Sequence, residues 1–95
     1  MGHPKERDRE AEKKAMLNRM ARAIGHMEAV KRMMEDDKDP SEVLIQLAAV
    51  RSAITGLSRR ILQEHIETAL EEAKEHPESE EELEDLKKVI SYFVK

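Results

Sequence analysis

Residues 43–70 (VLIQLAAVRSAITGLSRRILQEHIETAL) constrain the fold most, because they carry two adjacent stripes at helical spacing. The first stripe is purely apolar and repeats in steps of three and four: Val43, Leu47, Val50, Ile54, Leu57 and Ile61. The second mixes small apolar residues with polar ones: Leu44, Ala48, Arg51, Thr55, Ser58, Leu62, His65 and Ala69. Stripes of this kind are typical of a helix packed against other helices. Two of them exceed what one neighbour can cover, so we expect some neighbours to come from other copies of the chain.

Composition supports a helical class. The 95 residues form one domain with a small core, which favours oligomerisation as a source of extra buried surface. Charged residues make up 40% of the chain, with one Tyr, one Phe and no Trp, which favours amphipathic helices over a β-sandwich. No apolar run is long enough to cross a bilayer and no leader opens the chain, so a soluble, cytoplasmic protein without membrane contact is expected. The absence of cysteine excludes disulfides, thiolate metal sites and cysteine nucleophiles.

Charge is distributed unevenly along the chain. Residues 1–34 hold nine Lys/Arg and five Asp/Glu, whereas residues 63–88 hold three Lys/Arg and eleven Asp/Glu. An overall net charge of −4 therefore conceals a basic N-terminal part and a strongly acidic C-terminal part. This polarity allows an acidic protein to present a basic face to nucleic acid, with the acidic region turned away from it.

The chain is predicted to form three helices after a polar, mobile arm over residues 1–11. The first helix covers residues 12–36, and its apolar stripe is interpreted mainly as core: Met16, Met20, Ala23, Met27, Val30 and Met34. Glycines interrupt the first and second helices at Gly25 and Gly56. If these helices fold back on each other, Gly25 falls near Arg51 and Gly56 near Met20, so close backbone approach is the expected reason for both.

Capping residues define the remaining boundaries. Asp39 as N-cap, Pro40 at the first helical position and Glu42 two residues later begin a second helix over residues 40–75. The connection of two or three residues forces an antiparallel hairpin. His76-Pro77 ends this helix, because the residue before proline is disfavoured in the helical region. Ser79 and Glu82 are expected to cap a third helix over residues 80–94, with Leu83, Leu86, Ile90 and Phe93 on one face. The prediction is a single all-α domain over residues 1–95.

Two segments of this hairpin carry a family resemblance. LNRMARAIGHMEAVKRMMEDD followed by VLIQLAAVRSAITGL resembles the small helical repressors that sense copper, nickel/cobalt or formaldehyde, the CsoR/RcnR/FrmR family. The most specific match is LAAVR at residues 47–51. The resemblance implies a three-helix subunit, a dimer-of-dimers homotetramer, and binding to operator DNA that an inducer releases. It also implies operator contacts from basic positions, here Arg19, Arg22 and Arg51, and a histidine ligand at His65. Lys14 in the same basic segment is a further candidate DNA contact.

Three positions depart from the family pattern and bear on the inducer. The family's cysteine is Pro40 here, its second ligand one turn after the histidine is Ala69, and its glutamine after the first-helix glycine is His26. Copper(I) requires soft thiolates, so Cu(I) sensing is excluded, and formaldehyde sensing through that cysteine is not expected. A metal inducer would be Ni(II), Co(II) or Zn(II), held by nitrogen ligands from His65 and from His3 near the N-terminus. The alternatives are a packed histidine between helices at position 65 and an unstructured polar terminus at position 3.

The sequence does not favour an enzyme. It has no Gly-rich phosphate loop and no nucleophile with a base at readable spacing. Two functions remain open: a DNA-binding repressor, or a helical oligomeric interaction module that derives from the same family and no longer senses metal. The basic residues have an alternative of their own, in which they are solvated or form ion pairs between subunits.

Overall fold

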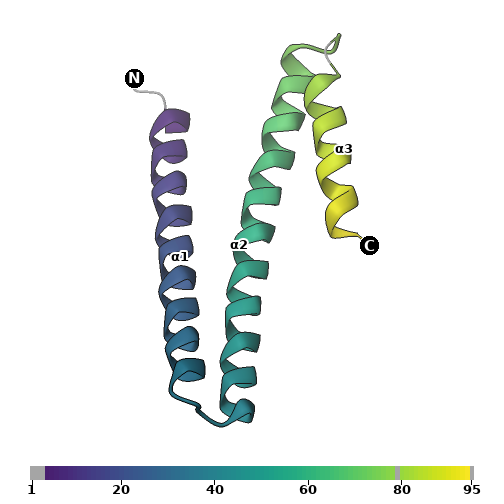
Figure 1. Cartoon of the computed structure of the whole chain (residues 1–95). Helices are drawn as coiled ribbons and strands as arrows, with labels where there is room; N and C mark the ends of the chain where they lie inside the picture. Colours follow the sequence, from purple (N-terminus) through teal and green to yellow (C-terminus); the bar gives the residue numbers. More distant parts are fainter. Residues whose placement is uncertain (1–3, 79, 95) are drawn as a thin grey trace. The chain divides into compact units, whose positions relative to one another are not determined.

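The computed structural model describes the backbone of residues 4–78 and 80–94, with side chains from Asp8 onward. Three helices follow one another: α1 (Pro4–Glu35), α2 (Pro40–Glu75) and α3 (Glu81–Phe93) (Figure 1). They divide into two compact units, Met1–Ser58 and Arg59–Lys95, so α2 contributes to both. The predicted all-α class, with two long helices and a short C-terminal one, is confirmed. None of the helices, over the residues described, is long and apolar enough to span a membrane.

Helix α1 begins earlier than the sequence predicts. It starts at Pro4 rather than at residue 12, so residues 4–11, assigned above to a mobile arm, are helical. Proline suits a first helical turn because its fixed φ is compatible with the helix and its missing N–H has no partner there. The following Lys, Glu, Arg and Ala residues are good helix formers, although they lack the apolar stripe on which the sequence boundary relied.

The connection between α1 and α2 is closed by hydrogen bonds at both helix ends. Asp37 has a φ of 53°, and its N–H donates to the Met34 carbonyl at 3.2 Å. The Lys38 N–H reaches back to the Met33 carbonyl at 3.0 Å, which completes the Schellman pattern of helix termination. On the other side, the Ser41 N–H donates to Asp39 Oδ1 at 3.0 Å. The predicted N-cap at Asp39 is confirmed, and the antiparallel course of the two helices around it is visible in Figure 1.

The first unit has a narrow core between α1 and α2. Ala23 and Val30 of α1 are buried with Val43, Val50 and Leu57 of α2. Half-buried side chains extend the α1 face in steps of three and four: Met16, Arg19, His26 and Met33. The predicted methionine stripe is therefore only partly in the core. Met20, Met27 and Met34 are 46%, 51% and 60% exposed in this chain.

The second unit consists of the rest of α2 and the short helix α3. The His76 N–H donates to the Glu72 carbonyl at 2.8 Å, the last helical bond before Pro77, as the sequence predicts. Ala69 is fully buried, and the α3 side chains Leu83, Leu86, Val89 and Ile90 are half-buried. The N-cap of α3 is Glu80, whose side chain makes no capping hydrogen bond, and Ser79 lies outside the described residues. Phe93, expected on the packed face, is 59% exposed.

Candidate functional site

Arg19 lies in the packed face of α1 and is half-buried. Its guanidinium rests over the backbone of α2, because a Cβ added at Gly56 would stand 3.0 Å from Arg19 Nη2. Gly56 therefore faces the tip of the Arg19 side chain, whereas the sequence predicts that it lies near Met20, the next residue of α1. Gly25 has no atom within 4 Å of its added Cβ, so the predicted close approach there, opposite Arg51, is wrong within this chain.

The other basic residues predicted to bind DNA are exposed but do not share one side of the hairpin. Lys14 and Arg22 are both exposed on α1. Their eight-residue separation leaves them about 80° apart at about 100° per residue. Arg51 is also exposed, one helical turn after Leu47. Arg51 lies five residues before Gly56, the α2 residue that meets Arg19. At about 100° per residue, Arg51 and Gly56 are therefore about 140° apart around the axis of α2.

Two contacts fix which side of α1 meets which side of α2. Arg19 lies over Gly56, and His26 bonds Gln46, so these four residues flank one side of the valine core. Helical periodicity then places a set of large apolar side chains on the other side, and all are 40% exposed or more. We call this set the exposed apolar face: Leu17, Met20, Ile24 and Met27 of α1 with Leu44, Leu47 and Ile54 of α2. Arg51 lies within its α2 portion.

The hydrogen bond between His26 and Gln46 was not predicted from the sequence. His26 Nε2 lies 2.7 Å from Gln46 Oε1 in a partly buried position. With the amide oxygen as acceptor, the imidazole donates from Nε2. His26 follows the 16, 19, 23, 26, 30 spacing of the packed face. That spacing is the signal that could have identified it, had polar residues been allowed in the stripe.

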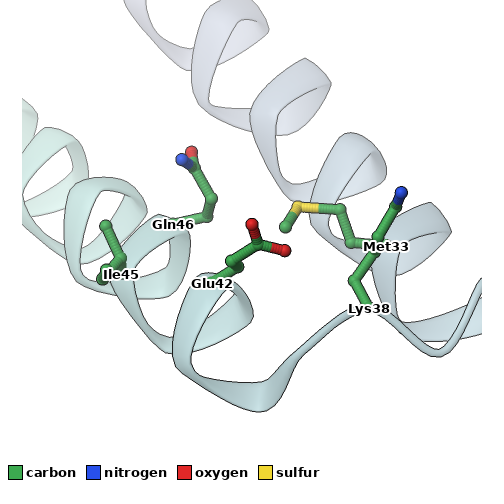
Figure 2. Close-up of a pocket in the computed structure, with 5 residues that line it drawn as sticks. All are labelled: Met33, Lys38, Glu42, Ile45 and Gln46. Carbon is green, nitrogen blue, oxygen red and sulfur yellow. The ribbon is translucent and has the colours of Figure 1, made fainter.

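An open pocket of about 330 Å³ lies beside the turn of the hairpin (Figure 2). Met33 of α1, Lys38 of the connection and three residues of α2 line it: Glu42, Ile45 and Gln46. Figure 2 shows the Met33 thioether and the Glu42 carboxylate directed towards each other across this space. The lining combines one cation, one anion, an amide and apolar groups. Over the described part of the chain, no group of three or more His, Cys, Asp or Glu residues is placed to hold a metal ion, here or elsewhere.

Over the described residues, the candidate ligand His65 belongs to no group of three or more potential metal ligands. His65 is half-buried in the second unit. Ala69, one turn later, is fully buried, and its methyl side chain cannot bind a metal. His76 lies on the surface, where Nδ1 is 3.6 Å from Glu78 Oε1. His3 lies outside the described residues. The described part of one protomer thus offers single nitrogen donors rather than a cluster of metal ligands. It also presents exposed cationic side chains on α1, which are suited to binding phosphate.

Comparison with known proteins identifies the family. Residues 12–92 match the family described as "Metal-sensitive transcriptional repressor". The transcriptional repressor RcnR of Citrobacter koseri (strain ATCC BAA-895 / CDC 4225-83 / SGSC4696) is 27% identical over 84 residues, which cover 88% of this chain and 93% of RcnR.

Two solved structures share the architecture. The nickel-responsive transcriptional regulator InrS is 36% identical with a TM-score of 0.76, over 85% of this chain and 91% of InrS. The copper-sensing repressor CsoR with Cu(I) from Geobacillus thermodenitrificans NG80-2 is 24% identical with a TM-score of 0.79. That match covers 100% of this chain and 94% of CsoR, and at this level of identity it shows a similar fold and nothing more. The chain therefore belongs to the metal-sensitive transcriptional repressor family of the CsoR/RcnR type, a non-enzymatic family, and it does so without a cysteine.

Proposed function

We propose that this protein represses transcription by binding double-stranded operator DNA through Lys14, Arg19, Arg22 and Arg51, and that an inducer releases it. The observation that carries the proposal is the charge of α1: residues 13–27 contain Lys13, Lys14, Arg19 and Arg22 and no carboxylate. Lys14 and Arg22 are exposed there, while Arg19 is held against α2. Because operator DNA lies in the cytoplasm, we place the protein in that compartment.

Phosphate contact and DNA shape would supply most of the recognition. The basic residues lie on long helices rather than on a short recognition helix or a ribbon, so the proposed interaction is with the outside of the duplex. Such contacts release counterions, and affinity falls steeply as salt rises. The acidic residues between 63 and 88 would repel the same phosphates, which favours α1 as the side that meets DNA.

Assembly into a homotetramer, a dimer of dimers, forms part of the proposal. The exposed apolar face defined above belongs to a chain in which only six apolar residues are buried among those described. Contiguous apolar surface on both helices of a hairpin is typical of an interface between copies. A second copy that covered this face would also bring its own Lys14, Arg19 and Arg22 onto the same particle, so basic residues of several copies could contact one operator. Arg51 lies within the covered face and would reach DNA only from the edge of the interface.

For the inducer, we propose a metal with a preference for nitrogen and oxygen ligands, Ni(II), Co(II) or Zn(II), bound through His65 and His3. The half-buried position of His65 and the lack of any cysteine support this choice over Cu(I). Isothermal titration with Ni(II) and Zn(II) tests it on the parent, on His65→Ala and on His76→Ala as a matched control, since His76 is a surface histidine beside Glu78. Weaker binding in His65→Ala alone supports the site, and equal affinity in all three proteins removes His65 from it.

A second function has one observation in its favour. Ala69 occupies the position of the family's second ligand and is fully buried, so that ligand is missing and the space is filled. On this alternative the chain is a helical oligomeric interaction module that has lost metal sensing. Oligomer formation without DNA binding or metal binding would be its signature.

Fluorescence anisotropy on the DNA upstream of the protein's own gene tests the main proposal. The parent is compared with Arg22→Ala and Arg51→Ala at several salt concentrations, and with Lys87→Ala as a control from the acidic α3. Each lost phosphate contact should weaken binding and lower the slope of log affinity against log salt by about one unit. Unchanged affinity and slope in both arginine variants, with the oligomer intact, would reject the basic surface of the hairpin as the operator surface.

A further inference from the structure

Arg19 differs from every other basic residue proposed to contact DNA, because it projects into the helix–helix contact. The packed face of α1 runs through Met16, Arg19, Ala23, His26 and Val30, and Arg19 is the one lysine or arginine in it. Lys14, Arg22 and Arg51 are exposed, whereas Arg19 is half-buried. An arginine in this position has fewer accessible rotamers than one in solvent, so less freedom is lost when it binds an anion.

Gly56 supplies the space in which the guanidinium of Arg19 lies. Glycine is the least favourable residue in a helix interior apart from proline, so its presence in the middle of α2 requires a reason. Backbone conformation is not that reason, because no glycine among the described residues has a positive φ. The added Cβ at Gly56 meets a single atom within 4 Å, Arg19 Nη2 at 3.0 Å. A methyl group at position 56 would therefore require the guanidinium to shift by a few tenths of an ångström, and it would press on no other neighbouring side chain or on α1.

We propose that Gly56 is a positioning residue for Arg19: by leaving the α2 backbone bare, it holds the guanidinium across the hairpin in the orientation presented to an operator phosphate. This inference rests on the proposed DNA-binding function and deepens it. A methyl group at position 56 would push Nη2 away, and the tip of a long side chain moves easily. The charge would remain on the protein, but its position and order would change.

Gly56→Ala is the informative variant, because its effects on folding and on DNA binding run in opposite directions. Alanine is a better helix former than glycine, so the melting temperature should stay the same or rise by a few degrees. Operator affinity should fall by about tenfold, the size expected for one charge-assisted hydrogen bond. Gly25→Ala is the matched control. It makes the same change in a helix interior where nothing lies within 4 Å, and affinity should be unchanged.

A double-mutant cycle separates positioning from a general structural effect. Arg19→Ala should weaken operator binding at least as much as Gly56→Ala, and adding Gly56→Ala to Arg19→Ala should change nothing further. If Gly56 merely shaped the hairpin, its substitution would weaken binding in both backgrounds. The Arg19 ¹Hε–¹⁵Nε resonance of the free protein reports the contact without DNA, and it should shift in Gly56→Ala but stay in place in Gly25→Ala.

The outcomes distinguish this inference from the proposed function. If Arg19→Ala weakens binding and Gly56→Ala does not, the positioning role is overturned while the DNA-binding role of Arg19 stands. If Arg19→Ala leaves affinity and salt slope unchanged, the operator role of Arg19 fails, and the role of Gly56 in DNA binding fails with it. A loss of affinity on Gly56→Ala that requires Arg19, together with the shifted Nε resonance, supports the proposal.

Discussion

His26 of α1 donates a 2.7 Å hydrogen bond to the side-chain amide of Gln46 on α2, next to the valine core of the hairpin. This bond joins residues 20 positions apart in the chain and therefore links the two helices directly. We expect His26→Ala and Gln46→Ala each to lower the free energy of unfolding by about 1 kcal/mol. In the double variant the losses should be less than additive, with a coupling of at least about 0.5 kcal/mol by urea denaturation. Fully additive losses would show that the bond contributes nothing to stability.

Glycine should stabilise the turn between α1 and α2 at position 37 only. Asp37 adopts a left-handed conformation with a φ of 53°, which is unfavourable for a residue with a side chain and natural for glycine. Its carboxylate also lies at the negative end of the α1 dipole. Asp37→Gly should therefore raise the free energy of unfolding by about 1 kcal/mol, and the melting temperature by a few degrees. Asp36→Gly removes the same charge where φ is not positive, so an equal gain from both variants would argue against backbone conformation as the cause.

Ile54 should distinguish assembly from folding. It belongs to the exposed apolar face and is 42% exposed in the protomer, so an aspartate there can remain hydrated while the chain is alone. In the proposed oligomer the same carboxylate would be buried without a partner, at a cost of several kcal/mol. We expect Ile54→Asp to remain helical by circular dichroism and to dissociate by light scattering.

Ser52→Asp provides the control for this experiment. Ser52 is exposed and lies two residues earlier, about 160° away around α2, so its substitution should leave the oligomer intact. Val50→Asp places the same charge in the core, where Val50 is 4% exposed, and should unfold the hairpin. If Ile54→Asp assembles like the parent, the exposed apolar face is not the interface.

Restoring the family's second ligand at position 69 should fail. Ala69 is 0% exposed, so a histidine there requires a larger, polar side chain in filled space. We expect Ala69→His to lose about 1–3 kcal/mol of stability without a gain in Ni(II) affinity. Thr68→His, at an exposed neighbouring position, controls for the added imidazole. A stable Ala69→His protein whose tighter Ni(II) binding depends on His65 would contradict this prediction.

Capping chemistry made the helix order and the hairpin turn readable from the sequence. Asp39 and Pro40 mark the start of α2, and His76-Pro77 marks its end, because proline and N-cap residues act through local sterics and hydrogen bonds. The start of α1 was misplaced because residues 4–11 have helix propensity without an apolar stripe. Propensity is a weaker signal than periodicity, so the apolar stripe predicts a later start of α1 than the structure has.

The α1 stripe was misassigned for a different reason. Two stripes one residue apart, 16-20-23-27-30-34 and 16-19-23-26-30-33, share Met16, Ala23 and Val30 and differ in the rest. The first stripe contains more apolar residues, whereas the second contains Arg19 and His26. The sequence therefore favours the first stripe as the one that faces the core. In the structure the second packs within the chain, and the remaining members of the first, Met20, Met27 and Met34, are left exposed. A single sequence does not separate surface covered by the same chain from surface available to another copy.

The Asp37 turn has a consequence for how quickly the hairpin can form. Val30 and Val43, the core pair nearest the turn, are separated by the twelve residues 31–42, which comprise the turn and the adjoining helix ends. Loops of about ten residues close in roughly 10–100 ns. Contacts farther from the turn, such as those of Ala23 and Val50, then form between helices that are already held together. Each of these later contacts therefore adds little to the entropy cost of loop closure. The hairpin can therefore form in a unimolecular reaction that is independent of protein concentration. Burial of its exposed apolar face by another copy would be a separate, second-order step.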